Sequence, residues 1–94
     1  MHSTTAVNSQ TDLGKVQIYP NPAKEVLHVT LEMPVQRDVI IELYSMSNVL
    51  VYRGELEHGR TSESHINVRE MAPGIYALRI TADEKPYNYL VVVE

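Results

Sequence analysis

The sequence predicts an all-β domain, and three observations support this fold class. From Lys15 onward, apolar residues alternate with polar ones at a period of two in segment after segment, which is the pattern of strands with one buried face. Turn-forming residues separate these segments at spacings of roughly ten residues. No segment shows the apolar period of a helix. About seven short strands fit an antiparallel β-sandwich of immunoglobulin-like type, and a small barrel is the second architecture.

Residues 1–14 differ in composition from the patterned region that follows. They are rich in Ser, Thr, Asn and Gln and contain few apolar residues, a composition typical of segments that do not join a core. We therefore interpret residues 1–14 as a linker or an appended leader, and we assign the β-sandwich domain to residues 15–94.

The first predicted strand ends at a proline-rich motif, Tyr19-Pro20-Asn21-Pro22. Each proline fixes its own φ and favours extended geometry in the residue before it. The Asn21 side chain is expected to bond its neighbouring backbone in an Asx-type turn. The motif thus predicts a stiff connection to the next strand, and an ordinary turn without further function is the plainer interpretation.

Two central strands carry the clearest alternation. The residues predicted to face inward are Leu27, Val29 and Leu31 in one strand and Val39, Ile41 and Leu43 in the next. Ser47-Asn48 interrupts the following apolar stretch, and Asn tolerates the left-handed backbone of a tight turn. We therefore expect residues 39–44 and 49–52 to pair as an antiparallel hairpin.

The second half of the chain is divided by further turn signals. A turn is predicted at Glu57-His58-Gly59-Arg60, followed by a short strand marked by Ile66 and Val68. At Pro73-Gly74, the glycine supplies a positive φ or a close backbone approach. The strands predicted after it are residues 75–80 and, beyond a turn at residues 83–86, residues 87–93.

Length and charge limit the possible functions. The chain has 94 residues and no cysteine, so it forms one small domain held by packing alone, in which a deep catalytic cleft is not expected. Its formal net charge is −4, with no basic cluster, which argues against nucleic acid as a partner. No apolar run has the length of a membrane helix, and the N-terminal residues lack a signal-peptide pattern.

The ionisable residues do not form a recognisable catalytic or metal-binding pattern. His28, His58 and His65 have no spacing to Glu57 or Glu63 that predicts a metal site, and by alternation His28 and His65 face outward. The carboxylates considered for glycoside chemistry are Glu55, Glu57 and Glu63. They flank a predicted turn, where solvated charges are ordinary, and nothing nearby would separate the pKa values of two of them. We therefore expect no enzyme, no cofactor and no metal.

Four segments, taken in order and spacing, resemble the type IX secretion system (Por secretion) C-terminal sorting domain, type A, and the resemblance covers most of the chain. The segments are Tyr19-Pro20-Asn21-Pro22 with residues 26–29, the strand-turn-strand of residues 40–51, Met71-Ala72-Pro73-Gly74-Ile75-Tyr76, and the closing Tyr89-Leu90-Val91-Val92-Val93.

The resemblance implies a secretion signal. Such a domain directs a cargo protein on its N-terminal side across the outer membrane of a Gram-negative bacterium through a translocon, with the help of shuttle proteins. A sortase-like signal peptidase then removes the domain, ahead of the β-region, and the cargo passes from the periplasm to the cell surface or the medium. The implied recognition residues are Tyr19, Pro20, Asn21, Pro22, Gly74, Tyr76, Lys85, Leu90, Val91, Val92, Val93 and Glu94.

The chain departs from the family pattern at two places. Asn48 stands where most members carry Gly, and Asn tolerates the same backbone. Members commonly have Lys before the last strand and a basic final residue, whereas this strand follows Tyr87-Asn88 and ends on Glu94, with Lys85 the nearest basic residue. A receptor that reads positive charge would bind this domain more weakly.

The last strand also has a physical reason to act in recognition. Residues 90–93 form an apolar, mostly β-branched run that can add to the edge of a partner's sheet, and the same edge can support a homodimer. A core strand that is apolar on both faces is the alternative interpretation of this run.

A non-catalytic adhesion or carbohydrate-binding module is the second functional class. Tyr44, Tyr52, Tyr87 and Tyr89 would support it if they formed one exposed platform, because tyrosines stack on sugar rings; cross-strand packing explains them equally well.

Overall fold

The computed structural model describes residues 5–11 and 13–94, and it describes side chains for residues 13–33, 38–56 and 63–94. The described chain consists of six strands joined by turns. They are β1 (Thr5–Thr11), β2 (Gly14–Asn21), β3 (Val26–Ser45), β4 (Leu50–Asn67), β5 (Gly74–Ala82) and β6 (Lys85–Val93). Within these residues no helix is long and apolar enough to cross a membrane.

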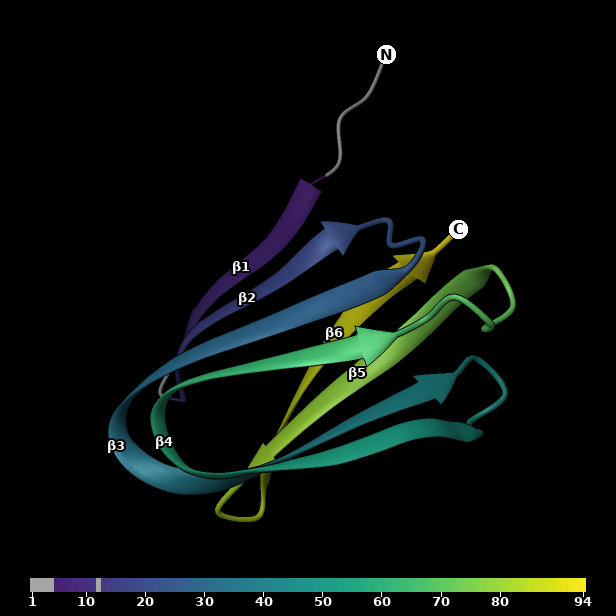
Figure 1. The fold of residues 1–94 in the computed structure, drawn as a ribbon. Helices are drawn as coiled ribbons and strands as arrows, with labels where there is room; N and C mark the ends of the chain where they lie inside the picture. The colour runs from purple at the N-terminus through teal and green to yellow at the C-terminus, as the bar shows by residue number, and fades with distance from the viewer. Residues whose placement is uncertain (1–4, 12) are drawn as a thin grey trace.

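The strands build a sandwich of two antiparallel sheets, one of three strands and one of four. Over residues 14–93 these sheets contain seven strand segments, because the continuous strands β3 and β4 each contribute a segment to both sheets, and the predicted all-β sandwich of about seven strands is confirmed. The long strands β3 and β4 are shared: residues 26–32 of β3 pair with β2 and with the end of β4, whereas residues 39–45 pair with β5 and the start of β4. Strand β6 follows β5 at the edge of the larger sheet. Figure 1 shows β3 and β4 curving together from one layer into the other.

The predicted turn at residues 57–60 is wrong, because β4 runs through these residues as a strand. Gly59 pairs with Arg37, and the register of the β3–β4 pair shifts on both sides of Arg37. Extra residues of this kind bend a paired ladder without ending it. The glycine and polar residues that read as a turn thus lie where a long hairpin bends between the two sheets.

The turns predicted at the hairpin tips are present. Asn48 adopts a left-handed backbone with φ 64°, and the Ser45 hydroxyl accepts hydrogen bonds from the main-chain N–H groups of Ser47 and Val49. Asp83 and Glu84 have φ 51° and 66°, the combination required by a two-residue type I′ hairpin turn. Strand β6 accordingly begins at Lys85, within the span predicted as a turn.

The core lies between the two sheets and is formed by alternate residues, as the sequence pattern predicted. Leu27, Val29 and Leu31 are fully buried, and so are Ile41 and Leu43. Apolar side chains of β5 and β6 complete this layer; the buried ones are Tyr76, Leu78, Ile80, Ala82, Val91 and Val93. None of the described polar or charged residues is buried, so the core is held by apolar packing.

Residues 1–14, which we interpreted as a linker or an appended leader, include a paired strand and a core residue. Strand β1 pairs antiparallel with β2, from Thr5 opposite Asn21 to Thr11 opposite Gly14. Leu13, which follows β1, is fully buried. Strand β1 therefore extends the smaller sheet beyond β2.

Candidate functional site

The proline-rich motif and the C-terminal strand meet at one end of the sandwich, although they lie at opposite ends of the sequence. The Asn21 side-chain oxygen Oδ1 accepts a hydrogen bond from the main-chain N–H of Val92 at 2.9 Å. The Ala23 N–H donates to the Val92 carbonyl at 2.8 Å, and the Glu94 N–H donates to the Ala23 carbonyl at 2.8 Å. We call this set of bonds, between residues 21–23 and 92–94, the terminal clasp.

The Asn21 side chain reaches farther than the neighbouring backbone of the predicted Asx-type turn, because its bond to Val92 spans 71 positions of the sequence. The Tyr19–Pro20 and Asn21–Pro22 peptide bonds are both cis. The motif forms the turn that the prolines predicted, and through the Asn21 side chain it also connects β2 to β6.

The clasp covers part of the outer edge of β6. Ala23 and Val93 form a short parallel bridge, so the main-chain groups of Val92 that point away from β5 are already paired. The remaining edge of β6, from Lys85 to Leu90, lies opposite no other strand of the described chain. An edge strand of this kind keeps backbone groups available for strand addition along that part only.

The end of β5 belongs to the same region. Gly74 pairs with Val93 and Tyr76 pairs with Val91. The buried Tyr76 ring packs in the core, and its hydroxyl donates a 2.6 Å hydrogen bond to the Ala72 carbonyl. Gly74 has φ 151°, a conformation that favours glycine, as its position after Pro73 predicted.

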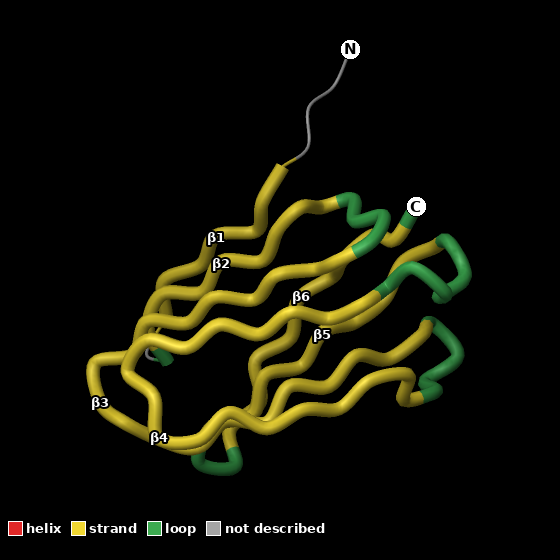
Figure 2. The backbone as a smooth tube through the Cα atoms, in the orientation of Figure 1, coloured by secondary structure: helices red, strands yellow, loops and turns green. Residues whose placement is uncertain are grey.

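Eleven of the twelve residues named as recognition residues thus lie at one end of the sandwich, on β2, β5 and β6, in the connection after β2, and at Glu94 directly after β6. Lys85 is the exception: it lies at the other end of β6, paired with Ala82 in the tight hairpin. Figure 2 shows the connections that follow β2, β3 and β4 near the C-terminus, with the β5–β6 hairpin at the opposite end.

Within the C-terminal strand, neighbouring residues have different surroundings. Val91 and Val93 are buried in the core, whereas Leu90 is 63% exposed and Val92 is partly buried. The outward side chains lie opposite Ala77 and Ile75 of β5, and Ile75 is 49% exposed. The end of the larger sheet therefore presents an apolar outer surface, made by Ile75, Ala77, Leu90 and Val92.

A shallow open pocket of about 570 Å³ lies beside the clasp. Its lining comes from the prolines of the motif, the connection after β2 and the last residue: Pro20, Pro22, Lys24, Glu25, Val26, His28 and Glu94. In this connection the Glu25 carboxylate pairs with Arg69 at 2.8 Å, and the Glu25 carbonyl accepts a hydrogen bond from the Val68 N–H. The pocket thus lies beside a connection that is bonded to the residues following β4.

The tyrosines do not form the platform that a carbohydrate-binding module would need. Tyr52, Tyr87 and Tyr89 pack against the core. Tyr44 lies on the outer face of the larger sheet, where the Arg79 guanidinium covers its ring at 5.1 Å. The tyrosines of the described chain are thus dispersed over both faces and the core, which counts against the second functional class.

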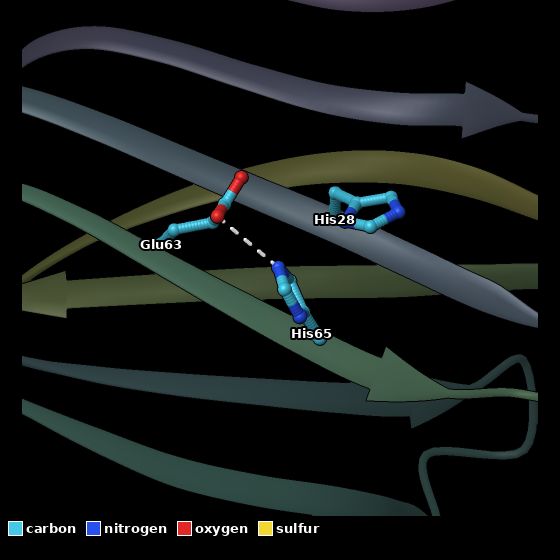
Figure 3. Close-up of side chains that lie close together, drawn as sticks. All are labelled: His28, Glu63 and His65. Atoms are coloured by element: carbon cyan, nitrogen blue, oxygen red, sulfur yellow. Dashed lines mark ion pairs between the residues drawn. The ribbon is translucent and has the colours of Figure 1, made fainter.

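Three of the residues considered for a metal site are brought together by strand pairing. His28 on β3 lies opposite His65 on β4, and Glu63 is on the same face of β4. One donor atom from each of the three lies within 4.8 Å of the others. Figure 3 shows the three side chains side by side over β3 and β4. The sequence spacing did not reveal this cluster, because it depends on the register of two strands far apart in the chain.

The other residues considered for chemistry have separate partners. Glu55 forms an ion pair with Arg53 at 2.9 Å, and Glu63 forms one with His65 at 3.2 Å. Glu55 and Glu63 form no carboxylate pair, and the side chains of Glu57 and His58 lie outside the described residues. Across the described side chains, the arrangement at the clasp is one of hydrogen-bonded backbone and exposed apolar groups, which suits binding to another protein.

The comparison with protein families agrees with this arrangement. A family model described as a secretion system C-terminal sorting domain matches residues 17–94. The matched region begins within β2 and includes the clasp, the β3–β4 hairpin and the last two strands. A search of the curated proteins found no match.

Proposed function

Because the chain belongs to the family of secretion system C-terminal sorting domains, we propose that it directs an attached N-terminal cargo protein across the outer membrane through the type IX secretion translocon. The observation that carries this proposal is the terminal clasp. It joins the Asn21–Ala23 segment to residues 92–94 through three hydrogen bonds, so that both ends of the matched region form one surface. The domain acts as a signal and has no catalytic role.

The proposal includes the steps that follow recognition. The folded domain is bound in the periplasm by shuttle proteins, passes its cargo to the translocon, and is then removed by a sortase-like signal peptidase ahead of β2. The cargo is released to the cell surface or the medium. Support for these steps comes from family membership alone.

We place the recognition surface on the exposed apolar residues next to the clasp. Leu90 and Ile75 contribute little to the core because their side chains are 63% and 49% exposed. Exposed apolar residues that gather on one surface commonly mark a protein interface. A partner that adds a strand along the open part of β6 would also contact the Leu90 side chain. A homodimer through this edge would use the same groups.

A reporter fusion tests the proposal. The 94-residue chain is fused to the C-terminus of a periplasmic fluorescent protein, and export is measured in a secretion-competent bacterium and in a mutant without the translocon. We expect the reporter in the medium or on the surface only when the translocon is present. A decrease in reporter mass equal to the domain would indicate removal by the peptidase.

Two matched variants separate recognition from folding. Leu90→Ser removes an apolar side chain from the proposed surface, and Met46→Ser removes one of similar exposure, 61%, from the β3–β4 hairpin tip. Export should fall severalfold with Leu90→Ser and remain unchanged with Met46→Ser, while both fusions stay folded. Equal export of both would reject this surface. Retention of the folded wild-type fusion in the periplasm would reject the sorting function and favour a binding module.

A further inference from the structure

A histidine-rich cluster on the outer face of the smaller sheet has no part in the proposed sorting function. It consists of His28, Glu63 and His65, which we call the β3–β4 triad. We propose that the β3–β4 triad binds one zinc ion and thereby joins β3 to β4 next to the proline-rich motif.

Strand pairing fixes the positions of the triad. His28 and His65 are directly opposite each other, and side chains opposite each other in an antiparallel pair have Cβ atoms about 4.5–5.5 Å apart. Glu63 precedes His65 by two positions and is opposite Thr30, so it lies on the same face, diagonal to His28. Zinc ligands on adjacent strands need this arrangement, because all three side chains point to one side of the sheet.

One of the donor distances is close to that of a zinc site. The His65 Nε2 and Glu63 Oε1 atoms are 3.2 Å apart, and two ligands on a tetrahedral zinc ion with bonds of about 2.0–2.2 Å lie roughly 3.3–3.6 Å apart. All three donors lie within 4.8 Å of one another, so the set needs only side-chain adjustment to converge on one ion. Two imidazoles and one carboxylate are a common zinc ligand set with a fourth position open to water.

A second observation concerns the His28 ring itself. Its Nδ1 atom is shielded from solvent and has no hydrogen-bond partner. A shielded ring nitrogen without a partner is unfavourable, and an ion or a water held by the ion is a recognised way to satisfy such a group. Thr30 Oγ1, on the same face, is likewise shielded and without a partner. The face that carries the triad thus has two shielded polar atoms without a partner, one of them on a triad residue.

Neighbouring residues hold the triad in place. The Tyr19 ring stacks on the His28 ring, with centroids 5.0 Å apart, and the His65 ring meets the other side of His28 edge-on at 4.6 Å. The Tyr19 hydroxyl lies 3.4 Å from Glu63 Oε2, so it donates to the carboxylate oxygen that does not face His65. Outer residues that orient ligands in this way strengthen metal binding.

Calorimetric titration of the 94-residue chain with zinc chloride tests the proposal directly. We expect one zinc per chain, and we expect His28→Gln and His65→Gln each to weaken binding at least tenfold. The chain offers a matched control, because His2→Gln/His58→Gln removes two histidines and leaves the triad intact. That double variant should bind zinc like the wild type.

Two outcomes would overturn the proposal. One is wild-type protein that shows no saturable zinc binding up to about millimolar concentrations, and the other is a double control variant that loses binding as fully as His65→Gln. If a triad variant fails to fold, long-range ¹H–¹⁵N spectra of wild-type histidine rings decide the matter. Zinc should then shift the His28 and His65 ring signals and leave the His58 signals unchanged; shifts confined to His2 or His58 contradict the site.

Discussion

Two glycines, at the first positions of β2 and β5, have backbone conformations that other residues adopt only with strain. Gly14 and Gly74 have φ 131° and 151°, so any side chain at either position strains the backbone by about 1–3 kcal/mol. They differ in their surroundings. A Cβ at Gly74 would meet nothing within 4 Å, whereas a Cβ at Gly14 would overlap the Glu32 carbonyl oxygen and lie 2.9 Å from the Met33 Cα.

We therefore predict that Gly14→Ala lowers the free energy of unfolding more than Gly74→Ala. The expected losses are more than about 3 kcal/mol and about 1–3 kcal/mol, respectively, because only Gly14 adds a clash with backbone to the strain. Urea unfolding followed by tyrosine fluorescence measures both, with Lys15→Ala, an exposed neighbour, as control. A neutral Gly14→Ala would mean that residues before Lys15 are no part of the folded unit.

Glu94 provides a residue-scale test of charge in recognition. Its main-chain N–H is fixed by the Ala23 carbonyl, and its side chain is exposed, so the side chain can change without altering the fold. If a receptor reads positive charge at this end, a reporter carrying Glu94→Lys should be exported several times more efficiently than wild type, with an unchanged melting temperature. Equal export would reject a charge-reading receptor, and Glu70→Lys, on the connection after β4, controls for net charge.

At the scale of elements, the terminal clasp determines how firmly β6 is held. Asn21→Ala leaves the Val92 N–H without its partner, which costs about 1–3 kcal/mol for a shielded donor. We predict that hydrogen exchange at the Val92 amide becomes at least tenfold faster and that export declines with it. Asn88→Ala removes an exposed amide that bonds only a neighbouring side chain, Arg79, so it should leave exchange at Val92 unchanged. Equal effects of the two variants would show that the clasp does not hold the strand.

The β5–β6 hairpin offers a prediction in the opposite direction. Glu84 has φ 66°, which is unfavourable for a residue with a long side chain, and Asp-Gly is a preferred type I′ sequence. Glu84→Gly should therefore raise the free energy of unfolding by about 1 kcal/mol. Glu70→Gly, at a position without positive φ, should not stabilise the domain. A destabilised Glu84→Gly in thermal unfolding would contradict this account of the turn.

The same elements explain what could be predicted from sequence. Alternation identified the buried faces of β3, because Leu27, Val29 and Leu31 repeat at the period of a strand, and Asn48 marked a left-handed turn. The bend of β4 near Gly59 was predicted as a turn, because glycine and polar residues occur both in turns and in bent strands. The clasp and the β3–β4 triad were not foreseen, since they depend on pairing between distant segments that local patterns do not specify.

At the scale of the whole molecule, the fold brings the two ends of the matched region into contact. The two sheets are joined through the shared strands β3 and β4, and the clasp ties β2 to β6 where those strands are far apart in sequence. A disturbance of the last strand would thus reach the proline-rich motif. The unit that a partner meets is an assembled surface, and a peptide of the last residues alone would lack most of it.

Truncation tests which part of the chain is needed to present this surface. A fusion of residues 13–94 keeps the buried Leu13 and the strained Gly14 and removes β1, which pairs only with the outer edge of β2. Because every clasp residue lies at or after Asn21, we predict full translocon-dependent export from this fusion. A fusion of residues 15–94 also loses the Leu13 side chain from the core, which costs about 2–5 kcal/mol by analogy with leucine truncations.

The shorter fusion should therefore melt at a lower temperature and be exported less, because more of its molecules lack the assembled surface at any moment. Export of both fusions is measured beside their melting temperatures. If export fell already in the 13–94 fusion while the domain stayed folded, β1 would itself be part of the signal. If the 15–94 fusion melted like the whole chain, the core of the domain would begin at β2, as the change in sequence composition at Lys15 predicted.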